Sequence, residues 1–181
     1  MLESNEPKLN TGIIDFHLKG TDEKVYSLEN FKDKKILVIV FMCNHCPYVK
    51  AITDRLTGLQ EEFASQGVQF IGINPNDEEA YPEDSFENMK IFYKDRKLNY
   101  PYLRDDTQEI ARLYDAVCTP DIYVYDSERK LKYRGRIDDN WKDEKIVIRR
   151  ELSDAIKKII EGNEPGKIQN PSMGCSIKWK L

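Results

Sequence analysis

The chain has 181 residues, of which 33% are charged and 40% hydrophobic, and its net charge at pH 7 is −4. This composition is typical of a soluble globular protein, and the length suits one domain with a full core. Basic and acidic residues are intermixed along the chain. The absence of a basic cluster argues against nucleic-acid or membrane-surface partners.

The N-terminal segment and the cysteine content indicate a compartment. MLESNEPKLNTGIIDF lacks the cationic start and apolar stretch of a signal peptide, and the longest apolar run, residues 36–43, is too short to cross a bilayer. We therefore expect a cytoplasmic protein. Four cysteines are too few for a disulfide scaffold, and cytosolic thiols are kept reduced.

The apolar patterns predict an α/β chain. KKILVIVFMC, residues 34–43, is apolar and largely β-branched, as a strand buried on both faces should be. Apolar residues then recur at helical spacing from Tyr48 to Gly67, and VQFIGIN, residues 68–74, has the pattern of a second buried strand. Strand, helix and strand in this order form the parallel crossover unit.

The remaining elements are expected to be shorter. Strands are predicted at 13–18 and 25–27, in YPYLR, and in a hairpin that turns at residues 127–130. Helices are predicted at 85–97, from about Asp106 or Thr107, and at 143–161. PNDEEAYPEDS is interpreted as a polar loop. The predicted organisation is a domain of residues 1–162 and a Gly-, Pro- and Asn-rich tail, residues 163–181, packed on it.

The sequence CNHC, residues 43–46, lies where the first buried strand gives way to its helix. A helix N-terminus carries about half a positive charge, and a thiolate placed there can have a pKa of roughly 3.5–7.5 instead of about 8.5. We expect Cys43 to be the exposed nucleophile, with Cys46 in the first helical turn closing the disulfide. His45 adds a potentially cationic group that favours the thiolate, unless it simply faces solvent.

These residues carry a family resemblance. CNHC after an apolar strand, with Thr119-Pro120 before a β-hairpin and a final helix, resembles the thioredoxin fold. The resemblance implies a central mixed sheet flanked by helices and a cis Pro120 that faces the two cysteines. It also implies that Thr119 offers its backbone to a bound substrate strand.

The resemblance extends over nearly the whole chain. FMCNHCPYVKA, CTPDIYVYD, GRIDDN and GCSIKW are together similar to the peroxiredoxin-like AhpC/TSA, or redoxin, branch of the thioredoxin superfamily. The N-terminal strands and the C-terminal tail extend a minimal thioredoxin. This branch implies thiol redox chemistry without an organic cofactor.

The sequence departs from both peroxiredoxins and thioredoxins at positions that their activities require. Peroxiredoxins carry P-x-x-x-T/S-x-x-C, but here the proline and the Thr/Ser positions hold Ile36 and Val40. No arginine lies in residues 116–122, which also argues against efficient peroxidase activity. Thioredoxins bury an acid six residues before the first cysteine, where this chain has Leu37, and precede that cysteine with Trp, where this chain has Met42.

Some other group must then deprotonate Cys46. Asp121, next to Pro120, is a candidate for that role, although a carboxylate at the entry of a strand is the alternative reading.

The other two cysteines leave alternatives open. Cys118, two residues before Pro120, is expected near the CNHC centre, as a further redox partner or a small buried side chain. Cys175 could resolve a mixed disulfide or a sulfenic acid on Cys43 if the tail covers the site, or it could simply be packed there. Trp179 is expected to anchor the tail.

We therefore predict a thiol–disulfide oxidoreductase that uses Cys43 and Cys46 and reacts with protein or small-molecule thiols and disulfides. An electron-donating thiol or reductase is a further expected partner. One alternative is a thiol peroxidase that uses Cys43, with Cys46 or Cys175 resolving. Another is a non-enzymatic zinc module that uses the four cysteines with His45 nearby, although structural zinc usually draws on two close cysteine pairs.

Overall fold

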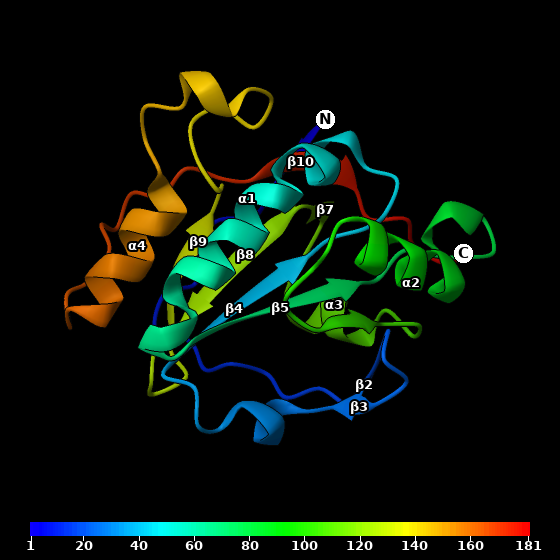
Figure 1. Ribbon diagram of the computed structural model, residues 1–181, viewed down its shortest axis with the longest axis horizontal. Helices are drawn as coiled ribbons and strands as arrows, with labels where there is room; N and C mark the ends of the chain where they lie inside the picture. The colour runs from blue at the N-terminus through cyan, green and yellow to red at the C-terminus, as the bar shows by residue number, and fades with distance from the viewer.

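The computed structural model describes residues 1–181 as an α/β protein built on a central mixed sheet flanked by helices (Figure 1). The helices are α1 (Pro47–Phe63), α2 (Phe86–Asp95), α3 (Glu109–Leu113) and α4 (Glu151–Ile160). The strands are β1 (Leu2–Glu3), β2 (Leu18–Gly20), β3 (Val25–Tyr26), β4 (Ile36–Phe41), β5 (Val68–Asn74), β6 (Tyr102–Arg104), β7 (Cys118–Thr119), β8 (Asp121–Tyr125), β9 (Leu131–Gly135) and β10 (Met173–Ser176).

The main sheet has seven strands in the order β3-β2-β6-β5-β4-β8-β9. β4 pairs with β5 in parallel and with β8 antiparallel. α1 is the crossover between β4 and β5, as the sequence predicted. Because β4 is an inner strand, the residues that follow its carboxyl end lie near the middle of that end of the sheet, next to the start of α1.

The two faces of β4 pack against two separate apolar clusters. Ile36, Val38 and Val40 pack with residues of α1, α2 and α4, while the alternate residues Leu37 and Ile39 pack with α3 and the N-terminal segment. All six residues of β4 are buried. This double coverage explains why the strand is an unbroken apolar run instead of an alternating one. In Figure 1, α1 and α4 lie over the same face of the sheet.

Two predicted elements are wrong in extent. The strand predicted at 13–18 contributes only Leu18, because the Asp15 carboxylate, instead of a strand partner, accepts the backbone N–H groups of Phe16 and Leu28. The helix predicted at 143–161 begins only at Glu151. A short 3-10 turn at Glu144–Ile146 precedes it.

The tail contains a strand, β10, which the sequence did not predict. β10 lies between β1 and β7 in a separate three-stranded sheet. Its register sets Gly174 opposite Leu2 and Cys175 opposite Thr119. The N-terminal strand thus lies beside β10 near the start of α1, whereas the C-terminus lies close to α2 (Figure 1). None of the helices is both long and apolar enough to cross a membrane.

Candidate active site

The candidate site lies where β4 ends and α1 begins. Cys43 follows β4 by two residues, and Cys46 is the residue that caps the N-terminus of α1. Pro47 occupies the first helical position, where its missing N–H costs no hydrogen bond. The sequence therefore directs both cysteines to one short loop at a helix start.

Thr119 contacts the sulfur atoms of both Cys43 and Cys46. Its hydroxyl lies 3.3 Å from Cys43 Sγ, and its carbonyl oxygen lies 3.3 Å from Cys46 Sγ. The bond from Thr119 to Pro120 is cis. The structure thus brings these four residues together across some 75 residues of sequence.

Burial of the pair differs from the expectation. Cys43 and Cys46 are both completely buried, so Cys43 is not the exposed nucleophile that the sequence predicted. The β10 strand on Thr119 and the loop that holds Asp84 both lie against this region, which explains why neither sulfur faces solvent.

The pKa values of Cys43 and Cys46 also differ from the expectation that Cys43 is the thiolate. A hydrogen bond from the Cys43 thiol, together with the Val49 backbone N–H at the start of α1, lowers the pKa of Cys46 to about 5 despite its burial. The same hydrogen bond raises the pKa of Cys43 well above its ordinary value, and burial and the nearby Asp84 carboxylate add to this effect. These shifts favour the thiolate on Cys46 and the proton on Cys43.

A buried carboxylate holds the CNHC loop, and the sequence did not reveal it. Asp84 Oδ1 accepts the Asn44 backbone N–H at 2.6 Å, and Asp84 Oδ2 lies 2.6 Å from His45 Nδ1. The Asn76 amide donates to the same oxygen at 2.7 Å. Asp84 is completely buried and is the last residue of a 3-10 turn inside the segment interpreted as a polar loop.

These bonds give His45 a defined orientation. The Asp84 contact engages Nδ1 of the ring and leaves Nε2 without this partner. The ring stacks on Tyr81 with 5.8 Å between centroids. Further support comes from the Tyr102 hydroxyl, which donates to the Asn44 side chain at 2.9 Å. His45 is therefore a partly buried, oriented side chain.

Asp121 is engaged elsewhere. It is completely buried and accepts hydrogen bonds from the Arg134 guanidinium at 2.8 and 3.3 Å and from the Tyr123 hydroxyl at 3.0 Å. Burial raises its pKa, and the Arg134 hydrogen bond opposes that rise. Asp121 is thus the partner of a buried ion pair and has no hydrogen bond to Cys46.

The other two thiols have different surroundings. The buried Cys118 thiol points to the Pro120 carbonyl oxygen at 3.7 Å, and burial raises its pKa. Cys175 is partly exposed, and burial and the proximity of Cys46 raise its pKa to about 11. The register of β10 sets Cys175 opposite Thr119, beside the cysteine pair. The Trp179 ring is partly buried and lies under the Arg112 guanidinium, 4.3 Å from its centroid.

The four cysteines do not converge on one point. The only group of three or more His, Cys, Asp or Glu side chains with ligand atoms close enough for a metal ion is Cys43, His45 and Asp84, within 4.8 Å of one another. Hydrogen bonds from the protein already engage both Asp84 oxygens. A four-thiolate zinc site therefore has no geometric basis in this fold.

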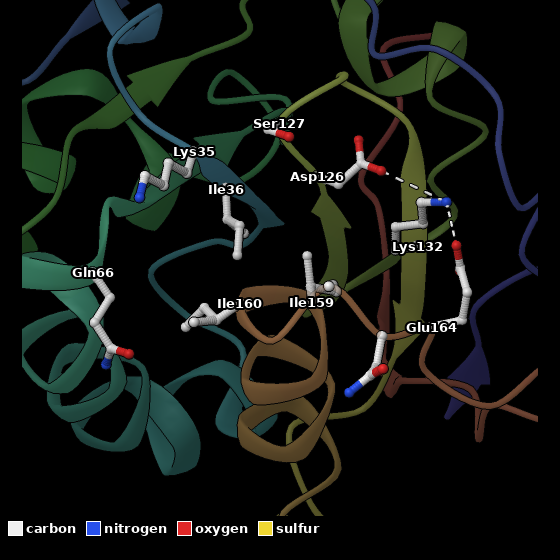
Figure 2. Close-up of a pocket in the computed structure, with 11 residues that line it drawn as sticks. Lys35, Ile36, Gln66, Asp126, Ser127, Lys132, Ile159, Ile160 and Glu164 are labelled. Atoms are coloured by element: carbon white, nitrogen blue, oxygen red, sulfur yellow. Dashed lines mark hydrogen bonds and ion pairs between the residues drawn. The ribbon is translucent and has the colours of Figure 1, made fainter.

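One cavity lies away from the cysteine pair. It has a volume of about 350 Å³ and is lined mainly by charged and polar side chains near Lys35 and the end of α4 (Figure 2). Lys132 spans it with ion pairs to Asp126 and Glu164. Because Lys35 precedes β4 and the cysteines follow it, this cavity and the cysteine pair lie at opposite ends of that strand. The cavity has no cysteine in its lining.

The comparisons decide the family. The AhpC/TSA family model matches residues 9–134. This chain belongs to the AhpC/TSA family. No curated protein matches it in sequence.

Solved structures extend the likeness of this AhpC/TSA protein to its full length. A hypothetical protein from Sinorhizobium meliloti 1021 is 36% identical, with 99% of each chain covered and a TM-score of 0.95. An uncharacterized conserved protein from Geobacillus kaustophilus is 43% identical, with 99% of this chain and 96% of that chain covered and a TM-score of 0.93. Both likenesses include the N-terminal strands and the tail.

A thiol:disulfide interchange protein of the thioredoxin family from Chlorobium tepidum is 21% identical, with 69% of this chain and 84% of that chain covered and a TM-score of 0.60. At this identity the likeness concerns the fold. The thioredoxin fold predicted from the sequence is confirmed.

Proposed function

We propose that this AhpC/TSA protein is a thiol–disulfide oxidoreductase that cycles between two thiols and a disulfide at Cys43 and Cys46. The observation that carries the proposal is the shared hydrogen bonding of the two sulfurs. Both lie 3.3 Å from atoms of Thr119, and the proximity of the Cys43 thiol lowers the pKa of Cys46. A hydrogen-bonded thiol and thiolate at a helix start is the reduced form that such a cycle needs.

The roles of the two cysteines follow from where the charge lies. Because the two pKa shifts favour the thiolate on Cys46 and the proton on Cys43, we assign the attack on a partner disulfide to Cys46 and the completion of the disulfide to Cys43. This order reverses the roles expected from the sequence alone.

The exchange balances without a cofactor. A partner disulfide that receives the Cys46 thiolate releases one thiol and leaves a mixed disulfide on Cys46. Cys43 then loses its proton and attacks Cys46 Sγ, which releases the second partner thiol and leaves the Cys43–Cys46 disulfide. The partner disulfide is reduced by two electrons and the protein is oxidised by two.

A second candidate is a thiol peroxidase. The Thr119 hydroxyl, 3.3 Å from Cys43 Sγ, supplies the hydrogen bond that neither Ile36 nor Val40 can give. Against it stands the raised pKa of Cys43, because the thiolate is the nucleophile.

One experiment tests the proposed thiol–disulfide exchange against the thiol peroxidase alternative. Reduced protein is mixed with glutathione disulfide, and the glutathione released is counted while the protein is mapped by mass. We expect two glutathione molecules per chain and a Cys43–Cys46 disulfide in the wild type, and no such disulfide in Cys43→Ser or Cys46→Ser. Consumption of hydrogen peroxide without exchange with glutathione disulfide would favour the peroxidase, and neither reaction would contradict both.

A further inference from the structure

The tail occupies the place where a substrate strand would pair. β10 runs antiparallel to β7, with Cys175 opposite Thr119 and Ser176 opposite Cys118. β1 covers the other edge of β10. An extended protein segment that adds a strand to a sheet needs an open edge. The backbone of Thr119, expected from the family resemblance to receive such a segment, already pairs with the chain itself.

Several contacts fix this strand as part of the domain. A Cβ atom on Gly174 would lie 1.9 Å from the Thr119 carbonyl oxygen, so the two backbones touch as closely as glycine permits. The Ile177 N–H donates to the Val117 carbonyl at 3.0 Å, and the Ser172 hydroxyl donates to Gly135 at 2.7 Å. Partners that reach the cysteine pair must therefore be small.

Only one sulfur of the cluster is accessible to such a partner. Cys43 and Cys46 are completely buried, whereas Cys175 is partly exposed and lies opposite Thr119, whose hydroxyl and carbonyl oxygen contact the two buried sulfurs. The charged groups that face Cys175 are Cys46, Lys178 and the N-terminal amine. The two cations attract an incoming thiolate, and Lys178 is held over the Tyr81 ring, 5.4 Å from its centroid.

We propose that Cys175 is the cysteine at which low-molecular-mass thiols exchange with the buried Cys43–Cys46 pair. The inference rests on the proposed function, and it adds both a third catalytic cysteine and a class of partner. Its basis is the exposure of Cys175, its position opposite Thr119 beside the two buried sulfurs, and the closed edge of β7.

The reduction of the protein then runs in three balanced steps. The Cys175 thiolate attacks Cys46 Sγ of the Cys43–Cys46 disulfide, which forms Cys46–Cys175 and releases Cys43. An external thiolate attacks Cys175 Sγ and releases Cys46, whose low pKa makes it a good leaving group. A second external thiolate attacks the external sulfur and frees Cys175. In sum, two external thiols become one disulfide, and the protein disulfide becomes two thiols.

The test measures a rate and an equilibrium on the same protein. Wild-type protein with the Cys43–Cys46 disulfide is mixed with excess reduced glutathione, quenched with acid at successive times and mapped by mass. Cys175→Ser is compared with Cys118→Ser, which replaces a buried cysteine outside the exchange route. The midpoint potential of the Cys43–Cys46 couple is measured in all three.

We expect Cys175→Ser to be reduced at least about tenfold more slowly than the wild type, because direct attack requires access to a buried sulfur. Its midpoint potential should stay that of the wild type, and Cys118→Ser should match the wild type in both. Early quenching of the wild type should show glutathione on Cys175. Reduction of Cys175→Ser at the wild-type rate, or an absence of glutathione on Cys175 during reduction of the wild type, would overturn the proposal.

The outcomes separate this inference from the function on which it rests. If the Cys43–Cys46 disulfide forms reversibly but Cys175→Ser is reduced as fast as the wild type, only the role of Cys175 fails. If wild-type protein forms no Cys43–Cys46 disulfide, the proposed function fails and the role of Cys175 fails with it.

Discussion

The charge on Cys46 depends on the thiol of Cys43, and this dependence can be measured. We consider Cys43→Ala, which removes the hydrogen bond that contributes most to the low pKa of Cys46. A hydrogen bond to a charged group contributes about 1.5–3 kcal/mol. At about 1.36 kcal/mol per pKa unit, its loss raises the pKa of Cys46 from about 5 to about 6–7.

The assay is the ultraviolet absorbance of thiolate as a function of pH, because it needs no reagent to reach a buried sulfur. In the wild type, one thiolate should appear with a midpoint near pH 5. In Cys43→Ala that midpoint should rise by about one to two units. Cys118→Ala is the matched control and should titrate as the wild type, because the Cys118 thiol points to Pro120.

Cys46→Ala gives the complementary result. The thiolate with a midpoint near pH 5 should be lost, because the remaining Cys43 is buried near Asp84. A low midpoint that persists in Cys46→Ala and disappears in Cys43→Ala would refute the assignment of the charge to Cys46.

Three further results are expected. The pKa of Cys46 is lower in the folded than in the unfolded protein, so the thiolate of Cys46 adds to the free energy of unfolding. This contribution is fully present above about pH 9 and is lost as the pH falls to about 5, with a slope of at most about 1.4 kcal/mol per pH unit. Urea unfolding of the wild type and of Cys46→Ser across this pH range should show the difference. Gly174→Ala forces a Cβ atom onto the Thr119 carbonyl and should lower the unfolding free energy by about 1–3 kcal/mol, and a wild-type melting curve would contradict the tight pairing of β10. Arg134→Met leaves the carboxylate of Asp121 buried without its partner, which should cost about 3–5 kcal/mol in the same unfolding assay, whereas a loss under 1 kcal/mol would show that the ion pair does not hold Asp121 in place.

The sequence predicts what local pattern determines. β4 and β5 are continuous apolar runs, and α1 has helical spacing with Pro47 at its first position. These elements alone place Cys46 at a helix N-terminus. The cis peptide before Pro120 was expected from the family resemblance and is present in the structure.

What the sequence did not predict depends on contacts between distant residues. Asp84 binds the backbone of Asn44, 40 residues away, from a segment whose acidic residues look like a solvated loop. Cys175 lies opposite Thr119 in a strand pair, although the two residues are 56 positions apart in the sequence. These two contacts bury Cys43 and Cys46, so their exposure and the location of the charge could not be read from the CNHC motif alone.

The most direct test of the account is a redox titration of the purified protein against glutathione, with mass mapping of the cysteines paired at each potential. The account predicts one reversible transition that joins Cys43 to Cys46, with Cys46–Cys175 as the only other internal pair. Absence of a reversible disulfide at Cys43 and Cys46 across the titration would contradict it.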